Sequence, residues 1–120
     1  MDEKEFKERT KRFALQIIEL VESLPKSKTT EIIGRQLLRS GTSVGANYRA
    51  ACRAKSAADM IAKLAIAEEE ADESIYWMEL LVDAGTVSAD QIDPLRAEAN
   101  QLVAMLVASM KTLRNRIQKI

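Results

Sequence analysis

The chain has 120 residues and a mass of 13.4 kDa, so we expect one domain spanning residues 1–120. A content of 47% hydrophobic and 30% charged residues excludes intrinsic disorder, and four Gly and two Pro are too few for an all-β domain. The sequence has no His, which removes the commonest general base and metal ligand, and its one Cys cannot form an internal disulfide. Because it also lacks an apolar run long enough to span a bilayer, we expect a cytoplasmic protein without membrane contact.

The first predicted helix covers residues 3–24, with Asp2 as its N-cap. Apolar residues recur on one face of this segment at helical spacing, namely at Phe6, Phe13, Ile17, Leu20 and Leu24. Pro25 ends the helix, because the residue before a proline is disfavoured in the α conformation.

The second predicted helix begins near Thr29 or Thr30 and continues without interruption through Gly41. Its apolar stripe consists of Ile33, Leu37, Ser40/Gly41, Val44, Tyr48 and Ala51. Each glycine inside a helix costs about 1 kcal/mol relative to alanine. We therefore expect Gly41 and Gly45 to lie where a neighbouring helix comes close.

The third predicted helix starts after a cap at Ser56 and runs to about Ala84, where Gly85 takes the left-handed position. For the last segment we expect a short turn at 89–92 and a long helix over 94–117 that begins at its proline. The inner face of this helix is predicted to carry Leu95, Ala99, Leu102, Leu106, Met110, Leu113 and Ile117. Four amphipathic helices joined by short connections predict an all-α, antiparallel up-down-up-down four-helix bundle.

Charge is unevenly distributed along the chain, although the net charge is zero. Residues 26–55 hold seven Lys/Arg and one acid, whereas residues 68–98 hold ten Asp/Glu and one Arg. One interpretation is a basic helix that lies beside an acidic helix and is neutralised by it. The other is a basic surface for an anionic partner.

Four arginines of the second helix fall on the side opposite its apolar stripe: Arg35, Arg39, Arg49 and Arg53. Guanidinium groups match pairs of anionic oxygens, so this arginine stripe is a candidate nucleic-acid-binding site. A solvated face or a set of salt bridges between subunits is the alternative interpretation.

Polar residues close to the predicted core form a candidate internal network, consisting of Ser43, Asn47, Glu68 and Glu70. We expect one of the two glutamates to accept hydrogen bonds from Asn47, Ser43 or an arginine, because a buried lone carboxylate is costly. Without His partners, neither the carboxylate run at 68–73 nor Cys52 predicts a metal site or a nucleophile. No catalytic residue, metal or cofactor is therefore expected.

Several large apolar residues project away from the core stripes: Leu15, Ile18, Ile66, Trp77 and Leu80. A chain of this size has no second core in which to bury them, so they are candidates for an oligomer interface.

The segments RQLLRSGTSVGANYRAA (35–51), AKS (54–56) and EEADESIYWMELL (69–81) resemble bacterial four-helix-bundle proteins encoded in intervening sequences of 23S ribosomal RNA. This resemblance implies an antiparallel bundle that assembles as a ring-like homopentamer, in which Ser43, Asn47 and Glu70 belong to an internal network. A related branch, the accessory proteins of diversity-generating retroelements, is strongly basic and binds reverse transcriptase and nucleic acid. The present chain departs from that branch with its net charge of zero and pI near 6.3.

Two hypotheses of function follow. The first is a non-enzymatic, homo-oligomeric scaffold or interaction protein with copies of itself as partners. The second is an accessory protein that binds ribosomal RNA, other structured RNA or DNA through the arginine stripe, with a reverse transcriptase as a further partner.

Overall fold

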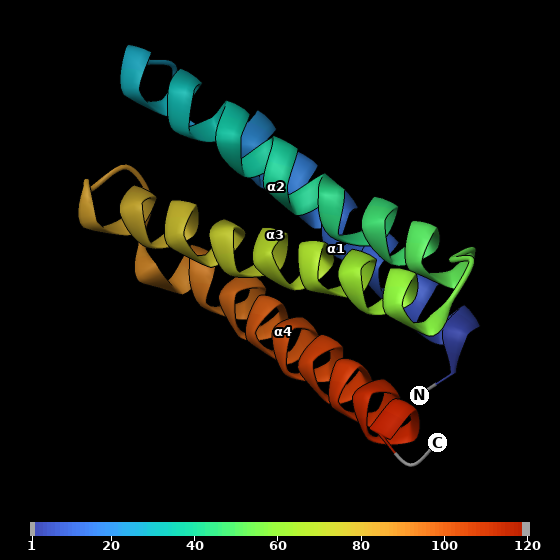
Figure 1. Ribbon diagram of the computed structural model, residues 1–120. Helices are drawn as coiled ribbons and strands as arrows, with labels where there is room; N and C mark the ends of the chain where they lie inside the picture. Colours follow the sequence, from blue (N-terminus) through green and yellow to red (C-terminus); the bar gives the residue numbers. More distant parts are fainter. Residues whose placement is uncertain (1, 119–120) are drawn as a thin grey trace.

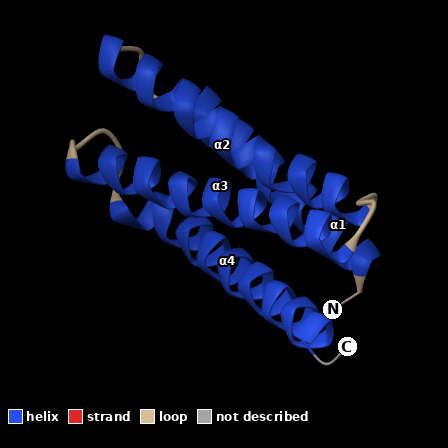
Figure 2. Ribbon diagram, viewed as in Figure 1, coloured by secondary structure: helices blue, strands red, loops and turns tan. Residues whose placement is uncertain are grey.

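In the computed structural model, which describes residues 2–118, the chain forms four long helices (Figures 1 and 2). Their bounds are Glu3–Glu22 for α1, Lys28–Cys52 for α2, Ala57–Asp83 for α3 and Ala89–Gln118 for α4. Consecutive helices run antiparallel and pack side by side, with the most extensive contact between α2 and α3 and the least between α1 and α4. The molecule is a rod of 53 × 21 × 20 Å, and the predicted four-helix bundle is confirmed.

The helix starts agree with the capping signals in the sequence. Ser27 accepts a hydrogen bond from the Thr30 backbone N–H while Thr30 accepts one from the Ser27 N–H, so α2 begins at Lys28, slightly earlier than predicted. The Ser56 side chain caps α3 by accepting from the Asp59 N–H at 3.0 Å. Gly85 follows α3 with φ +76°, the predicted left-handed conformation.

The predicted boundary at the start of α4 is wrong, because Ala89–Gln118 is one continuous helix with Pro94 inside it. Ser88 and Gln91 form a capping box that starts the helix upstream of the proline. Pro94 removes only the hydrogen bond to the carbonyl of Asp90, an exposed residue in the first turn whose carbonyl water can reach. A proline this close to the N-terminus therefore does not break the helix.

One continuous core lies along the axis of the bundle and includes Phe13, Ile17, Leu37, Leu64, Met78 and Leu102. The prediction for Ile117 is wrong, because 43% of this residue is exposed. Counting along the antiparallel helices from the Arg96–Glu79 ion pair places Ile117 level with the first turn of α3, at the end of the bundle. Ile92 is fully buried in the first turn of α4, which the proline-based boundary had excluded from the helix.

Glycines on α2 allow close contact with α1, as their positions in the sequence predict. A Cβ added at Gly41 would lie 2.8 and 2.9 Å from Cγ2 and Cγ1 of Ile17, a fully buried side chain. A Cβ at Gly45 would lie 3.0 Å from Oγ1 of Thr10. At Gly34 the nearest atoms of Val21 and Leu24 would be 3.4 Å away, which is ordinary contact.

Substitution of these glycines should give opposite results. Gly41→Ala is expected to lower the free energy of unfolding by about 1–3 kcal/mol, because the added methyl group overpacks against Ile17. Gly34→Ala has room and gains helix propensity, so it should raise that free energy by about 0.5–1 kcal/mol. Thermal and urea denaturation of the two variants measure both effects, and stabilisation by Gly41→Ala would contradict the close contact.

Candidate functional site

The arginine stripe of α2 divides into two parts in the structure. Arg35 pairs with Glu31 of its own helix at 3.2 Å, and Arg39 reaches across to α3. Arg49 and Arg53 form no ion pair within residues 2–118 and lie exposed near the end of α2. The stripe is therefore not a uniform row of free cations.

Arg39 joins α2 to α3 through two carboxylates. Its Nη1 atom lies 2.9 Å from Oε2 of Glu70, and its Nη2 atom pairs with Glu73. The hydrogen bond with Glu73 raises the pKa of Arg39. Oε2 of Glu73 also accepts a 2.9 Å hydrogen bond from the indole Nε1 of Trp77. Arg39, Glu73 and Trp77 thus form a chain of contacts that links the two helices.

The predicted polar network has a different set of contacts from the one expected. Among the predicted acceptors, Glu70 pairs with an arginine, as described for Arg39. The Asn47 amide donates to the Ser43 carbonyl at 2.9 Å, and the Ser43 hydroxyl donates to the Arg39 carbonyl at 2.6 Å. Glu68 is half-buried and makes no hydrogen bond to α2 in the described part of the chain. Asn47 and Ser43 are thus satisfied by their own helix.

A buried contact between two serines was missed by the sequence analysis. The hydroxyls of Ser40 on α2 and Ser74 on α3 lie 2.9 Å apart, and both residues are fully buried. This contact fixes the antiparallel register of α2 and α3. Two positions in the sequence could have revealed this contact. Ser40 lies within an apolar stripe, and Ser74 comes three residues after the buried Ala71.

Two hollows follow the outer side of the α1–α2 contact, and we call them together the α1–α2 groove. The first has about 440 Å³ and four cationic side chains at its lining: Lys7 and Lys11 from α1, Arg49 from α2, and Arg53 directly after α2. Of these, Lys7 pairs with Glu3 at 3.7 Å. Small residues form the rest of this basic hollow, including Ala14, Gly45 and Ala46.

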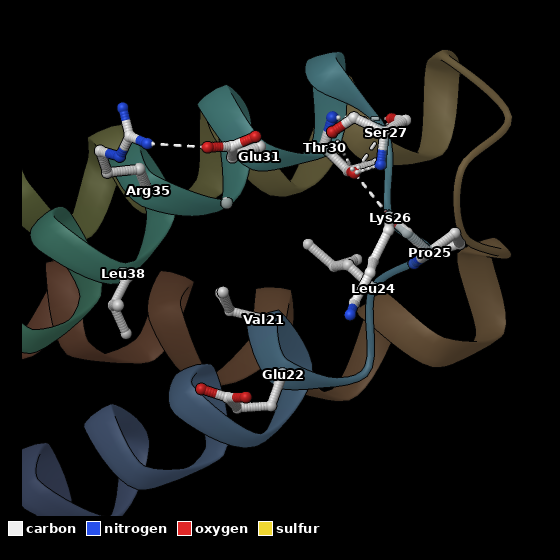
Figure 3. A pocket seen from close by; sticks show the side chains of 11 residues that line it. Val21, Glu22, Leu24, Pro25, Lys26, Ser27, Thr30, Glu31, Arg35 and Leu38 are labelled. Carbon is white, nitrogen blue, oxygen red and sulfur yellow. Dashed lines mark hydrogen bonds and ion pairs between the residues drawn. The ribbon is translucent and has the colours of Figure 1, made fainter.

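The second hollow lies at the α1–α2 turn and has about 730 Å³ (Figure 3). Val21, Leu24 and Leu38 give it apolar walls that point between the two helices. Glu22, Lys26, Glu31 and Arg35 supply charges of both signs around it. The α1–α2 groove is therefore basic at one end, and at the other it has apolar walls with charges of both signs around them.

The predicted interface residues are exposed to different degrees. Leu15 and Ile18 on α1 are 57% and 38% exposed, and Ile66 on α3 is 44% exposed. Leu80 is half-buried, whereas Trp77 packs against the core as well as donating to Glu73. The sequence analysis missed Tyr76, which is 54% exposed on α3. Trp77 thus supports the fold of one chain, while the other residues present apolar surface to solvent.

Cys52 is free and half-buried beside Tyr48 and Glu3. Burial, with the Glu3 carboxylate as the next cause, raises the pKa of its thiol, so the neutral form predominates at pH 7. Within residues 2–118, no group of three or more His, Cys, Asp or Glu side chains is placed to hold a metal ion. None of the helices in this range is both long and apolar enough to cross a bilayer.

The sequence pattern of the 23S rRNA-intervening sequence proteins matches residues 2–108. The chain belongs to this family. Its fold is similar to the crystal structure of a protein of unknown function from the S23 ribosomal protein family of Bacteroides thetaiotaomicron VPI-5482, with a TM-score of 0.83 and 36% sequence identity. That similarity covers 88% of this chain and 97% of the Bacteroides chain. No curated protein matches the sequence. Family membership confirms the resemblance that the three quoted sequence segments indicate.

The Arg39 contacts should contribute measurably to stability. Arg39→Met keeps the aliphatic stem and removes two ion pairs, so we expect the free energy of unfolding to fall by up to about 1 kcal/mol. Arg35→Met is the matched control, because Arg35 pairs only with Glu31 of its own helix. The side chains of Arg35 and Glu31 are each 70% exposed. Urea denaturation at low and high salt distinguishes the two. An equal effect of both substitutions would show that the α2–α3 ion pairs do not stabilise the bundle.

The Cys52 thiol should react slowly in the folded protein. Its raised pKa favours the neutral thiol, so the stabilisation from this group is present below the ordinary thiol pKa and lost as pH rises through the raised value. At pH 8 we expect alkylation by iodoacetamide to be at least several-fold slower than in the urea-unfolded chain. Equal rates in both states would contradict a protected thiol.

Proposed function

We propose that this member of the 23S rRNA-intervening sequence family is a non-enzymatic scaffold or interaction protein that assembles with copies of itself, as a ring of five. The exposed apolar residues of α1 and α3 carry this proposal, because a single bundle leaves Leu15, Ile18, Ile66 and Tyr76 in contact with water. Large apolar side chains exposed in this way are typical of an interface between subunits. The number five comes from what the resemblance of the sequence motifs implies.

The chemistry of the side chains supports a non-enzymatic role. The sequence has no His to act as a general base, and the one thiol is held in its neutral form. The hydroxyls of Ser43 and Thr42 donate to carbonyls of their own helix. These groups are therefore committed to the fold rather than poised for reaction.

Nucleic-acid binding receives less support than self-assembly. Two of the four stripe arginines are paired with carboxylates, and the whole chain has no net charge. The remaining candidate site for RNA phosphates is the basic hollow, where Arg49 and Arg53 lie with Lys7 and Lys11. Occupation of this hollow by RNA is therefore one outcome of the charge-reversal experiment below.

Self-assembly is tested by measuring the mass of the purified protein in solution. Light scattering and sedimentation velocity at micromolar concentration should give five times the chain mass of 13.4 kDa. A monomer would overturn the proposal, whereas a closed assembly of another size would overturn only the number five.

Substitution of the exposed α1 residues should dissociate the assembly without unfolding the bundle. Leu15→Gln combined with Ile18→Gln removes apolar surface that the single chain leaves in water, so we expect a shift toward monomer with a nearly unchanged melting temperature. Val107→Gln is the control, because this residue is 44% exposed, between Ile18 and Leu15 in exposure, but belongs to α4. Equal loss of assembly in both variants would contradict an interface on α1.

A further inference from the structure

We propose that the α1–α2 groove of one copy receives helix α3 of the next, with acidic residues of α3 in the basic hollow and Leu80 in the apolar hollow. This inference rests on the proposed self-assembly and assigns the two surfaces that meet. Contact between two different surfaces is heterologous, and such a contact closes into a ring when the rotation between copies permits it.

The outer face of α3 has the composition that this groove would bind. Glu69, Asp72, Tyr76 and Leu80 follow one another at spacings of three, four and four residues, so they share one face of the helix. Glu69, Asp72 and Tyr76 are exposed, and the two carboxylates form no ion pair within the described residues. The face therefore has free acids at one end and apolar side chains at the other.

The groove has the complementary order of charge and apolar surface. Lys11, Arg49 and Arg53 in its basic hollow lack an intramolecular ion pair in the part of the chain that the structure describes. Toward the α1–α2 turn the groove becomes apolar, with Val21, Leu24 and Leu38 along its walls (Figure 3). Opposite free charges and matching apolar surface favour contact between copies.

The levels of these groups along the bundle also agree. The Ser40–Ser74 contact sets the register of the antiparallel helices α2 and α3. Leu80 is six residues after Ser74 and Gly34 is six residues before Ser40, so these two residues lie at the same level along the bundle. Gly34 packs beside Val21 and Leu24, so Leu80 lies at the level of the apolar hollow.

The same register places the acids at the level of the cations. Glu69 is five residues before Ser74 and Gly45 is five residues after Ser40, so these two residues also lie at the same level. Gly45 packs against Thr10, which precedes Lys11 in the sequence. All three residues line the basic hollow. A rotation about an axis parallel to the bundle leaves these levels unchanged. It therefore brings Glu69 to the cations and Leu80 to the apolar hollow in one contact.

Charge reversal on each surface tests this pairing. One variant carries Arg49→Glu and Arg53→Glu in the groove, and the other carries Glu69→Lys and Asp72→Lys on α3. Each variant alone places like charges together, so we expect sedimentation to shift from the assembly to the single chain. A chain that carries all four substitutions should recover the assembly, because its reversed α3 then fits the reversed groove of the next copy.

A variant with Lys111→Glu and Arg114→Glu on α4 is the matched control. These two exposed residues give the same change of charge away from the groove, so the mass should remain that of the unchanged protein. Thermal denaturation by circular dichroism establishes that every variant is folded before its mass is compared.

The outcomes separate this inference from the proposed function. A monomeric unchanged protein would overturn both. An assembly that persists in both charge-reversed variants would overturn the α3-in-groove contact and leave self-assembly standing. If Arg49→Glu with Arg53→Glu keeps the mass but abolishes low-salt retention of a structured RNA on filters, the groove is a nucleic-acid site and the inference is wrong.

Discussion

The small residues of α2 let this helix pack closely against α1 and α3 at the same level. Gly41 leaves no room for a Cβ beside Ile17 of α1, and the adjacent Ser40 bonds to Ser74 of α3. Because interiors are close-packed, a shift of one helix along another would break both contacts. The three helices are thereby held in one register. The levels of the charges along the outer surfaces of α1, α2 and α3 follow from that register.

The helices and the core were predictable from the sequence because they depend on local periodicity and on capping residues. The apolar stripes of α1, with Phe13 and Ile17, and of α2, with Leu37 and Val44, are buried as the spacing indicates. Pro94 misled the prediction, because the capping box at Ser88 had already started the helix. Ile117 was predicted to be buried because it continues the apolar stripe of α4, but it is exposed at the end of the bundle. The periodicity of one helix does not show where the neighbouring helix ends.

The polar contacts were less predictable, because periodicity gives the face of a residue but not the reach of its side chain. Asn47 and Ser43 lie on a flank of α2, yet they bond to carbonyls of α2 itself. Arg39 is long enough to span the space to α3 and reaches Glu70. Arg39 and Arg49 are ten residues apart, which at 3.6 residues per turn separates them by roughly a quarter turn. One stripe in the sequence therefore has a paired end toward α3 and a free end toward α1.

The net charge of zero results from two kinds of balance. Arg39 with Glu70 and Glu73 balances charge inside one chain, as expected for a basic helix beside an acidic one. The cations of the basic hollow and the free acids of α3 lie on different surfaces of the bundle. Opposite charges held apart in this way attract other molecules, and a copy of the same chain offers both signs in the same spacing. A partner with the chain's own register satisfies both surfaces at once, whereas a phosphate backbone would satisfy only the basic one.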